Sequence, residues 1–398
     1  MNGRLMQTPK LRHLRRFFSR HTSAVDGYCA APAEFTAGNR LDLLVDGKEV
    51  YPAMLKAVSG ARKSVNLETY MFASDRTGRA FGAALAERAR AGVEVRLIYD
   101  SVGSLDLDAT FLQWMRNQGV QTLEYRPVVP WRQHWGLSRR DHRKILVVDG
   151  QIAFTGGLNI TDDHADPSEG GTGWHDTHVR IEGPAAYELE RLFRSTWYRE
   201  TGRWFDSGAD LHHAPGSSLV RVVANHEFLH RHRIHRAYLH AIHRARERIC
   251  IANAYFIPDH GIRSALYRAR RRGVDVRVLV PSISDVPAAA YASRRLFHMH
   301  LHAGLRLFAW PGPMMHAKIA VVDGIWGVVG SYNMDHRSML HNLEANIHVV
   351  DRDFSSRLEV SLLRDMEHSR EITHDRWVLR PYSERVFEEC FHWLRYWL

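Results

Sequence analysis

The sequence predicts an α/β fold built from two similar domains in tandem. A nine-residue stretch at 142–150, HRKILVVDG, returns at 316–324 as HAKIAVVDG. In each half, stretches with strand character alternate with amphipathic helical stretches, which is typical of layered α/β folds. The chain has 398 residues, a length that suits two domains of about 150–200 residues each.

The repeat extends well beyond these nine residues. HRKILVVDGQIAFTGGLNI and HAKIAVVDGIWGVVGSYNM align without a gap, and SVNLETYMFASD at 64–75 resembles RICIANAYFIPD at 248–259. RARAGVEVRLIYD at 88–100 likewise resembles ARRRGVDVRVLVP at 269–281. A repeat this long indicates a duplicated, fused domain and not a solenoid unit. We therefore expect two domains related by a pseudo-twofold axis, each with a mostly parallel or mixed sheet flanked by helices.

The elements of the first copy follow from its hydrophobic pattern. Residues 51–64 predict a helix, because Met54, Leu55, Val58 and Ala61 recur at helical spacing. VNLETYMF at 65–72 predicts a strand, TGRAFGAALAERARAG at 77–92 predicts a helix ended by glycine, and VEVRLIYD at 93–100 predicts a second strand.

The repeated stretch itself predicts a hairpin. KILVVDGQIAF at 144–154 reads as two antiparallel strands joined at Asp149-Gly150, because Asp-Gly favours a tight hairpin turn.

We expect four segments along the chain. These are a basic N-terminal tail at 1–39, a first domain at 40–210, a second domain at 211–380 and an aromatic amphipathic segment at 381–398. The first 20 residues are basic without an acid, which favours a disordered tail that can still touch lipid. The last residues, VFEECFHWLRYWL, fit a membrane interface and a helix docked on the core equally well.

Composition restricts the partners and the compartment. Hydrophobic residues make up 45% and charged residues 25%, as in ordinary globular proteins, and the net charge of +10 favours an anionic partner. Nucleic acid, an acidic membrane surface and a phosphorylated substrate all meet that description. The three isolated cysteines favour a reducing compartment. We expect neither a secretory signal nor a membrane-spanning segment, since no apolar run approaches ~20 residues.

Each copy of the repeat carries a histidine and a lysine two residues apart. In a strand, His142 and Lys144 would face the same side, as would His316 and Lys318. Lysine is rarely buried unpaired, so the pair suits phosphate binding, with histidine as nucleophile or proton carrier. A single copy would fit a chance pair on a half-exposed strand. Two copies, each followed by Asp, Gly and Asn at the same spacings, indicate a shared function.

These motifs resemble those of the phospholipase D superfamily, in which H-x-K-x4-D is followed by G-[GS]-x-N. The matching residues are His142, Lys144, Asp149, Gly156, Gly157 and Asn159, then His316, Lys318, Asp323, Gly330, Ser331 and Asn333. Flanking blocks, among them AERARAGVEVRLIYDSVGS, RRDHRKILVVDG and NLEANIHVVD, are similar to bacterial cardiolipin synthases. The similarity covers about residues 40–380 and is greatest to short forms without N-terminal membrane helices.

The resemblance implies a two-step mechanism without a cofactor or metal. One histidine attacks the phosphorus to form a phosphohistidine, and the other protonates the leaving alcohol and then deprotonates the incoming one. By analogy His142 is the expected nucleophile and His316 the acid and base. The groups expected to hold the phosphate oxygens are Lys144, Lys318, Asn159 and Asn333.

Four carboxylates and an arginine pair complete the expected site. Asp176 and Glu344 match the positions that orient the histidines in related enzymes. Asp149 and Asp323 belong to the catalytic motif, but their place beyond the strand favours a structural turn. Arg139-Arg140 fits a phosphate contact and a solvated basic turn equally well.

The resemblance implies a phosphatidyltransferase that converts two phosphatidylglycerol molecules into cardiolipin and glycerol through a phosphatidyl-histidine. Its expected place is the cytoplasmic side of a bacterial cell membrane, peripherally bound to the anionic surface, with no nucleic acid as partner. One alternative is a phospholipase D-type phosphodiesterase or nuclease with the same site. A non-catalytic basic binding protein is the other, and two complete motif sets argue against it.

A run of histidines at 226–243 is a candidate zinc site. The repeat instead aligns Leu239, Ile242 and Ala245 with the buried stripe of the first-copy helix. We therefore expect the histidines to lie on a solvated basic face.

Overall fold

The computed structural model describes residues 27–29, 31–129, 131, 134, 136, 139–207, 213–225 and 232–393. The basic tail up to residue 26, His226, His230 and residues 394–398 lie outside the described residues.

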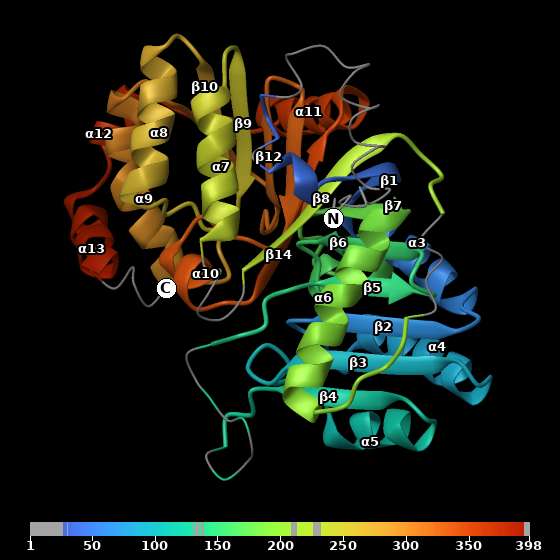
Figure 1. The fold of residues 1–398 in the computed structure, drawn as a ribbon. Helices are drawn as coiled ribbons and strands as arrows, with labels where there is room; N and C mark the ends of the chain where they lie inside the picture. Colours follow the sequence, from blue (N-terminus) through green and yellow to red (C-terminus); the bar gives the residue numbers. More distant parts are fainter. Residues whose placement is uncertain are drawn as a thin grey trace, which may run out of the picture.

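The first half contains the helices and strands that the repeat predicts (Figure 1). In chain order these are η1 (Pro32–Glu34), β1 (Thr36–Val45), α3 (Asp46–Ser59), β2 (Ser64–Thr69), α4 (Arg76–Arg90), β3 (Glu94–Asp100), α5 (Ala109–Asn117), β4 (Gln121–Tyr125), β5 (Ile145–Val148), β6 (Ile152–Gly156), η2 (Asp162–His164), η3 (Pro167–Glu169), β7 (Thr177–Glu182) and α6 (Pro184–Thr201).

The second half repeats this order. Its elements are β8 (Ser218–Asn225), α7 (Arg233–Arg244), β9 (Arg248–Asn253), α8 (His260–Arg271), β10 (Asp275–Pro281), α9 (Pro287–His302), β11 (Arg306–Trp310), β12 (Lys318–Val322), β13 (Trp326–Gly330), α10 (His336–Leu340), β14 (Glu344–Val350), α11 (Arg352–Glu367), β15 (Arg370–Ile372), α12 (His374–Val378) and α13 (Tyr382–Trp393).

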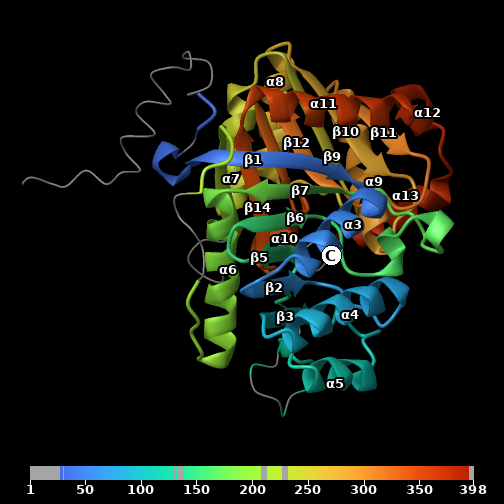
Figure 2. The same ribbon diagram turned by 90° about the vertical axis from the view of Figure 1, so that its right-hand side faces the viewer.

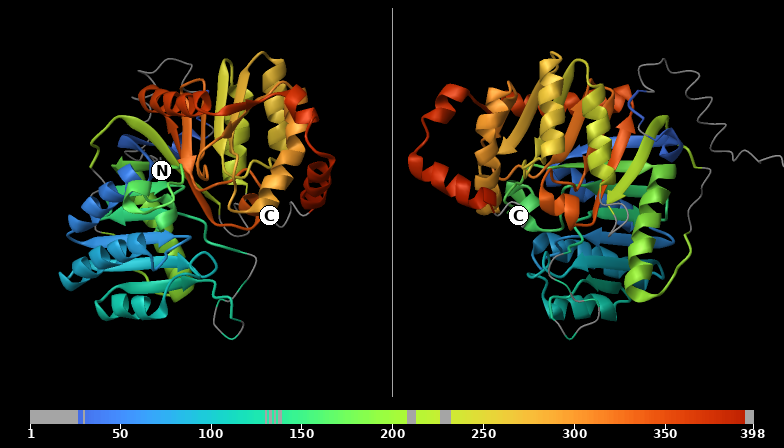
Figure 3. Two further views of the ribbon diagram at one scale, coloured as in Figure 1. Left: turned by 180° about the vertical axis from the view of Figure 1, so that it is seen from behind. Right: turned by 60° about the vertical axis from the view of Figure 1, so that its left-hand side comes forward.

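One mixed sheet of 15 strands runs through both halves of the described chain. Its order is β15-β11-β10-β9-β12-β13-β14-β8-β1-β7-β6-β5-β2-β3-β4. Reading outward from the β8–β1 pair gives β14, β13, β12, β9, β10, β11 on one side and β7, β6, β5, β2, β3, β4 on the other. The two halves are thus arranged as the predicted pseudo-twofold repeat, and Figure 3 shows them side by side.

The sheet of each half combines parallel and antiparallel pairs. β2, β3 and β4 are parallel, as are β9, β10 and β11, whereas β5, β6, β7 and β1 pair antiparallel. Helices cover both faces of the first-half strands, with α6 on one side and α4 on the other (Figure 2). The predicted mixed α/β fold is confirmed.

The predicted hairpin is present, and its aspartate holds the fold together. Asp149 and Gly150 have φ of 54° and 69°, the left-handed pair of a tight hairpin turn. The Asp149 carboxylate accepts hydrogen bonds from the amides of Arg62, Lys63 and Ser64. Asp323 does the same for the amides of Arg246, Glu247 and Arg248 in the second half. Each aspartate therefore joins the hairpin to the start of the neighbouring strand.

The two halves share a hydrophobic core. One buried cluster contains Ile145 and Val147 of β5, Ile319 and Val321 of β12, and apolar residues of α6 and α11. Separate clusters fill the space between each half-sheet and its own helices. Strands β5 and β12, which carry the repeated hairpins, therefore belong to one continuous packed interior, which fixes their relative position.

The C-terminal helix is docked on the second domain. Tyr291 of α9 stacks on Phe391 of α13 with ring centroids 5.6 Å apart, and Arg294 and Arg295 pair with Glu384 and Glu389. The exposed surface of α13 is mixed: Tyr382 is 79% and Trp393 is 75% exposed, and the charged Arg385 and Glu389 are exposed as well. Among the described helices, none has the length and apolarity needed to cross a bilayer.

Candidate active site

Both HxK motifs open into one cavity of about 280 Å³. His142, His316, Asn159 and Asn333 line it. The other lining residues are Tyr70, Met71, Arg140, Trp174, Tyr255, Asp285, Val286, Ala289, Asp335, Arg337, Ser338 and Asn342. The structure thus brings together groups that lie 174 positions apart in the sequence.

Backbone pairing across the halves positions the two histidines. The amide of His142 donates to the carbonyl of Leu343, and the amide of His316 donates to the carbonyl of His175. Glu344 and Asp176 are the next residues along those partner segments. The two HxK segments were expected to lie within strands, and the structure corrects this by a few residues. β5 starts at Ile145, just after the first motif, and β12 starts at Lys318, the lysine of the second motif.

A carboxylate from the second half orients His142. Its Nδ1 lies 3.2 Å from Glu344 Oε2 and 3.2 Å from the carbonyl oxygen of Ser331. Ser331 Oγ donates to the same carboxylate at 2.5 Å, and Ser338 Oγ donates to it at 2.8 Å. With Nδ1 engaged in this network, Nε2 is the nitrogen left to face the cavity.

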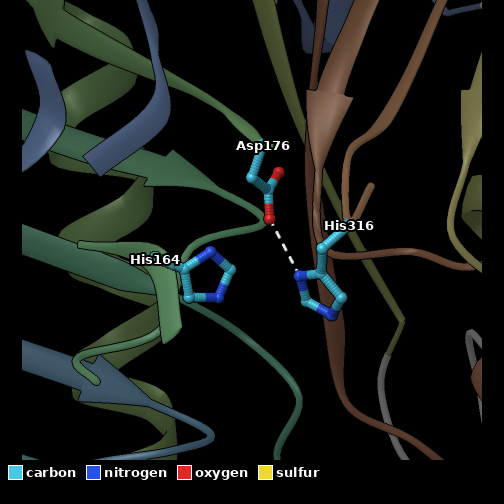
Figure 4. Close-up of side chains that lie close together, drawn as sticks. All are labelled: His164, Asp176 and His316. Carbon is cyan, nitrogen blue, oxygen red and sulfur yellow. Dashed lines mark hydrogen bonds and ion pairs between the residues drawn. The ribbon is translucent and has the colours of Figure 1, made fainter. Parts of the chain in front are cut away.

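A carboxylate from the first half orients His316. Its Nδ1 lies 2.8 Å from Asp176 Oδ2, as Figure 4 shows. Gly157 allows this approach, because a Cβ there would lie 2.2 Å from Asp176 Oδ1. The second copy has Ser331 at the equivalent position and uses its hydroxyl to hold Glu344. The two motifs therefore differ at this position for a physical reason. Glycine leaves room for Asp176 in the first copy, and serine donates a hydrogen bond to Glu344 in the second.

The two lysines are buried beside the histidines. Lys144 Nζ donates to the His142 carbonyl at 2.9 Å and lies 5.2 Å from the Tyr70 ring centroid, and Lys318 Nζ donates to the His316 carbonyl. Burial, with the charge of the neighbouring lysine, lowers the pKa of Lys144 to about 7. Burial lowers the pKa of Lys318 to about 8. Burial and mutual repulsion destabilise the charged form of both lysines, and an anionic ligand bound beside them would stabilise it.

The two asparagines occupy equivalent places but differ in their contacts. Asn159 Oδ1 accepts from the Met71 amide at 3.2 Å, whereas the buried Oδ1 of Asn333 has no hydrogen-bond partner among the described residues. Both side chains line the cavity, so their amide groups can reach a bound phosphate.

Burial favours the uncharged form of both histidines. It lowers the pKa of His142, with a further contribution from Lys144, and it lowers the pKa of His316 well below the usual value, with contributions from Lys318 and Lys144. A neutral imidazole is the form that can act as a nucleophile or accept a proton.

Two groups from the expected site have other contacts. Asp149 and Asp323 do not line the cavity and instead bind backbone amides, as the structural interpretation predicted. Arg140 lines the cavity but is buried with Asp100 at 3.4 Å and also donates to the carbonyl of Arg126. Arg139 does not line the cavity.

Several cavity residues were not identified from the sequence. They include Tyr70, Trp174, Tyr255, Asp285, Asp335 and Arg337. One pair of these cavity residues could have been predicted from the repeat. Met71 and Tyr255 occupy equivalent positions in the aligned blocks, and both line the cavity.

A third buried histidine lies next to His316. The ring of His164 is 5.3 Å from that of His316, and in Figure 4 it faces the Asp176–His316 pair. Ligand atoms of these three residues lie within 4.8 Å of one another, a grouping that can hold a metal ion. Burial lowers the pKa of His164 well below its usual value, and His316 and the two lysines lower it further. The positive charge of Lys144 and Lys318 makes the centre more suitable for an anion than for a cation.

Comparisons with known proteins agree with this geometry. The family model described as "Cardiolipin synthase, PLD-like domain" matches twice, at residues 54–197 and 238–366. A cardiolipin synthase of Geobacillus sp. (strain WCH70) is 34% identical over 87% of this chain and 70% of its own length. A cardiolipin synthase A of Pseudomonas putida is 36% identical over 85% of this chain and 70% of its own length. The greater likeness to short forms stays a prediction.

Solved structures support the fold. A phosphatidylserine synthase of Haemophilus influenzae Rd KW20 superimposes with a TM-score of 0.69 at 12% identity, covering 90% of this chain and 95% of its own. A polyphosphate kinase of Porphyromonas gingivalis does so with a TM-score of 0.55 at 15% identity, over 82% of this chain and 50% of its own. With the twofold family match and the relatives above, the chain belongs to the cardiolipin synthase family of phosphatidyltransferases, within the phospholipase D superfamily.

Proposed function

We propose that this protein makes cardiolipin by transferring a phosphatidyl group from one phosphatidylglycerol to the hydroxyl of another. The observation that carries the proposal is the pairing of two carboxylate-oriented histidines on one cavity, each with a buried lysine bonded to its carbonyl oxygen. That arrangement provides a nucleophile, an acid and base, and positive charge around a single phosphorus.

In the first step, His142 Nε2 attacks the phosphorus of the phosphatidylglycerol headgroup. A nitrogen–phosphorus bond forms and the bond from phosphorus to the glycerol oxygen breaks. His316 enters this step as an imidazolium that Asp176 and the bound phosphodiester stabilise, and it gives its Nε2 proton to that oxygen. Glycerol therefore leaves as a neutral alcohol, and His316 becomes the neutral base that the second step requires. Asp176 and Glu344 keep the Nδ1 protons in place and stabilise positive charge on the imidazoles.

In the second step, a hydroxyl of another phosphatidylglycerol attacks the phosphatidyl-histidine. His316 takes the hydroxyl proton, the new oxygen–phosphorus bond forms, and the nitrogen–phosphorus bond breaks. His142 returns to its starting form and cardiolipin is released. Lys144, Lys318, Asn159 and Asn333 stabilise the phosphate oxygens in both steps.

The lipid chains stay in the membrane during both steps. The cavity of about 280 Å³ is slightly smaller than the roughly 300–1,000 Å³ of typical ligand pockets, so it suits a headgroup and not two acyl chains. Leu105 follows β3 and is 74% exposed, and Ile283 follows the equivalent strand β10 and is 64% exposed. Ser104 donates to the Tyr70 carbonyl, and Asp285 lines the cavity, so both loops lie at its mouth.

We place the protein peripherally on an anionic bilayer, on the cytoplasmic side, with these two loops and the exposed aromatic residues Tyr382 and Trp393 of α13 in contact with lipid. The double variant Leu105→Ser with Ile283→Ser should sediment less with phosphatidylglycerol vesicles. Val360→Ser is the matched control, because Val360 is an exposed apolar residue of α11 away from the mouth. Equal vesicle binding of the double variant and the control would contradict this placement.

The function is tested by incubating the purified protein with phosphatidylglycerol vesicles without added metal and resolving the products by mass spectrometry. Cardiolipin with one glycerol per cardiolipin is expected, and His142→Ala should abolish both. Phosphatidic acid alone would mean that water is the acceptor and the enzyme is a phospholipase D. No lipid turnover by folded protein would refute the lipid substrate and favour a nuclease.

A further inference from the structure

A second cavity, of about 670 Å³, lies apart from the active site. It is formed by α6, by η1 and β8, and by Arg233 at the start of α7. The residues that line it and those that line the active-site cavity have no member in common. Its size falls within the range of ligand-binding pockets.

The walls of this cavity carry excess positive charge. Arg191, Arg194, Arg199 and Arg233 line it, against the carboxylates Glu34 and Glu188. Both carboxylates are already used, because Glu34 accepts from Arg233 and from Arg221, and Glu188 accepts from Arg191 at 2.8 Å. Among the described residues, Arg194 and Arg199 have no ion-pair partner.

Arg194 is the unusual member of this set. It is 7% exposed, yet its guanidinium carbon lies 4.4 Å from the Trp204 ring centroid and 5.5 Å from that of Phe205. Its buried Nε has no hydrogen-bond partner in the part of the chain that the structure describes. Burial raises the pKa of Glu190, one turn earlier, while the hydrogen bond from Ser207 and the charge of Arg194 act to lower it. A buried guanidinium with free donors on an aromatic platform is well suited to bind a phosphate.

The remaining lining is apolar or aromatic. Leu192 and Ala224 are buried, and Tyr198 and Trp204 present 49% and 58% of their surface at the opening. The lining thus combines an apolar floor, made by Leu192 and Ala224, with several arginines. This combination suits an amphiphilic ligand that carries a negatively charged phosphate. A purely polar anion would leave the floor and the aromatic edges without a partner.

We propose that this cavity is a second, non-catalytic site that binds one anionic phospholipid. Its phosphate would lie on Arg194 and Arg199, and part of an acyl chain would cover the floor at Leu192 and Ala224. The site goes beyond the proposed transfer reaction, and its occupancy can be measured whether or not that reaction takes place.

The segments that form this cavity also hydrogen-bond a residue of the HxK motif. Arg143 lies between His142 and Lys144 and is fully buried. It donates to Thr196 Oγ1 at 2.9 Å and to the Asn225 carbonyl at 3.2 Å. The neighbouring residues Ser195 and Ala224 line the cavity, so a lipid bound there contacts the segments that hold Arg143.

The test counts binding sites by calorimetry in the His142→Ala protein, which cannot form the covalent intermediate. Monodisperse dihexanoyl-phosphatidylglycerol should bind at two sites per chain. Arg194→Gln or Arg199→Gln should weaken one site at least tenfold and leave the other unchanged. Lys318→Met should show the reverse pattern. Arg271→Gln, an exposed arginine of α8 outside both cavities, is the control and should change neither.

The outcomes separate the alternatives. A single site that is insensitive to both arginine variants would overturn the proposal, and Arg199→Gln decides the matter if Arg194→Gln does not fold, since Arg199 is exposed. Inorganic phosphate binding at the arginine site as tightly as the lipid would show that the lipid chain plays no part and would refute the phospholipid assignment. Binding of the lipid at least tenfold tighter than phosphate, lost in both variants, is the expected result.

Discussion

At the scale of single residues, the active site depends on carboxylates that each half supplies to the other. Glu344 of the second half bonds His142 of the first, and Asp176 of the first half bonds His316 of the second. Neither half therefore contains a complete histidine–carboxylate pair. The exchange explains why the motif must occur twice and why the copies must meet.

Replacing these carboxylates by amides should keep the shape and remove the charge. Glu344→Gln and Asp176→Asn should each lower kcat by about 10²–10⁴-fold, because an amide can present the wrong group to Nδ1 and does not stabilise the imidazolium. Steady-state kinetics on phosphatidylglycerol would measure the effect. Asp365→Asn is the control, since Asp365 bonds His175 and not a motif histidine. Unchanged kcat in both variants would contradict the proposed orientation.

The two buried lysines make anion binding depend on pH. Their pKa values of about 7 and about 8 mean that raising the pH neutralises them near physiological conditions. Affinity for glycerophosphoglycerol, a phosphodiester of constant charge in this range, should therefore fall as the pH rises from 6.5 to 9. The loss approaches about tenfold per pH unit for each neutralised lysine. Calorimetry should show a shallower slope for Lys144→Met, and a pH-independent affinity of the unmodified protein would refute the assignment.

At the scale of elements, the aspartates at the hairpin turns are structural. Asp149→Ala removes the acceptor for three backbone amides and places alanine at φ 54°, where aspartate is better tolerated. We expect a loss of about 2–4 kcal/mol in the free energy of unfolding, measured by denaturant titration. The folded fraction should retain kcat within a few-fold. A large fall in kcat at unchanged stability would instead place Asp149 in the chemistry.

The sequence was sufficient to predict two helices, two strands and the hairpin of each half, but β1, α5, β4, β7 and α6 of the first half were not predicted. The 3.6-residue spacing of Met54 and Val58 and the Asp149-Gly150 turn are local signals, and the repeat supplied the same elements a second time. Their arrangement into one sheet through β1 and β8 was not predicted, because strand pairing between distant segments leaves no local pattern.

The motif residues of the site were also predictable, but its walls were not. His142 and His316 stand out because they recur with lysine at a fixed spacing. Tyr70, Trp174 and Asp335 reach the cavity only because loops from different strands converge there. Arg194 would not be distinguished from other helix arginines until α6 is placed against β8.

At the scale of the whole molecule, duplication makes one site from two equivalent halves. The strand order mirrored about β8–β1 places β5 and β12 at equivalent positions, and the shared core between them holds the two histidines at a fixed separation. The same symmetry brings the loops after β3 and β10 to the two sides of the cavity mouth. One chain therefore supplies both histidines and both carboxylates of the candidate site.

This intramolecular assembly predicts the behaviour of mixed variants. His142→Ala and His316→Ala should each be inactive, and a mixture of the two purified proteins should be inactive as well, because no chain in it has both histidines. Cardiolipin formation from phosphatidylglycerol vesicles, measured by mass spectrometry across a range of protein concentrations, is the readout. Co-refolding the two variants from denaturant tests whether halves can be exchanged between chains. If the mixture regained about a quarter of the unmodified activity, the site would be assembled between chains, and the single-chain cavity formed by β5 and β12 would not be the active centre.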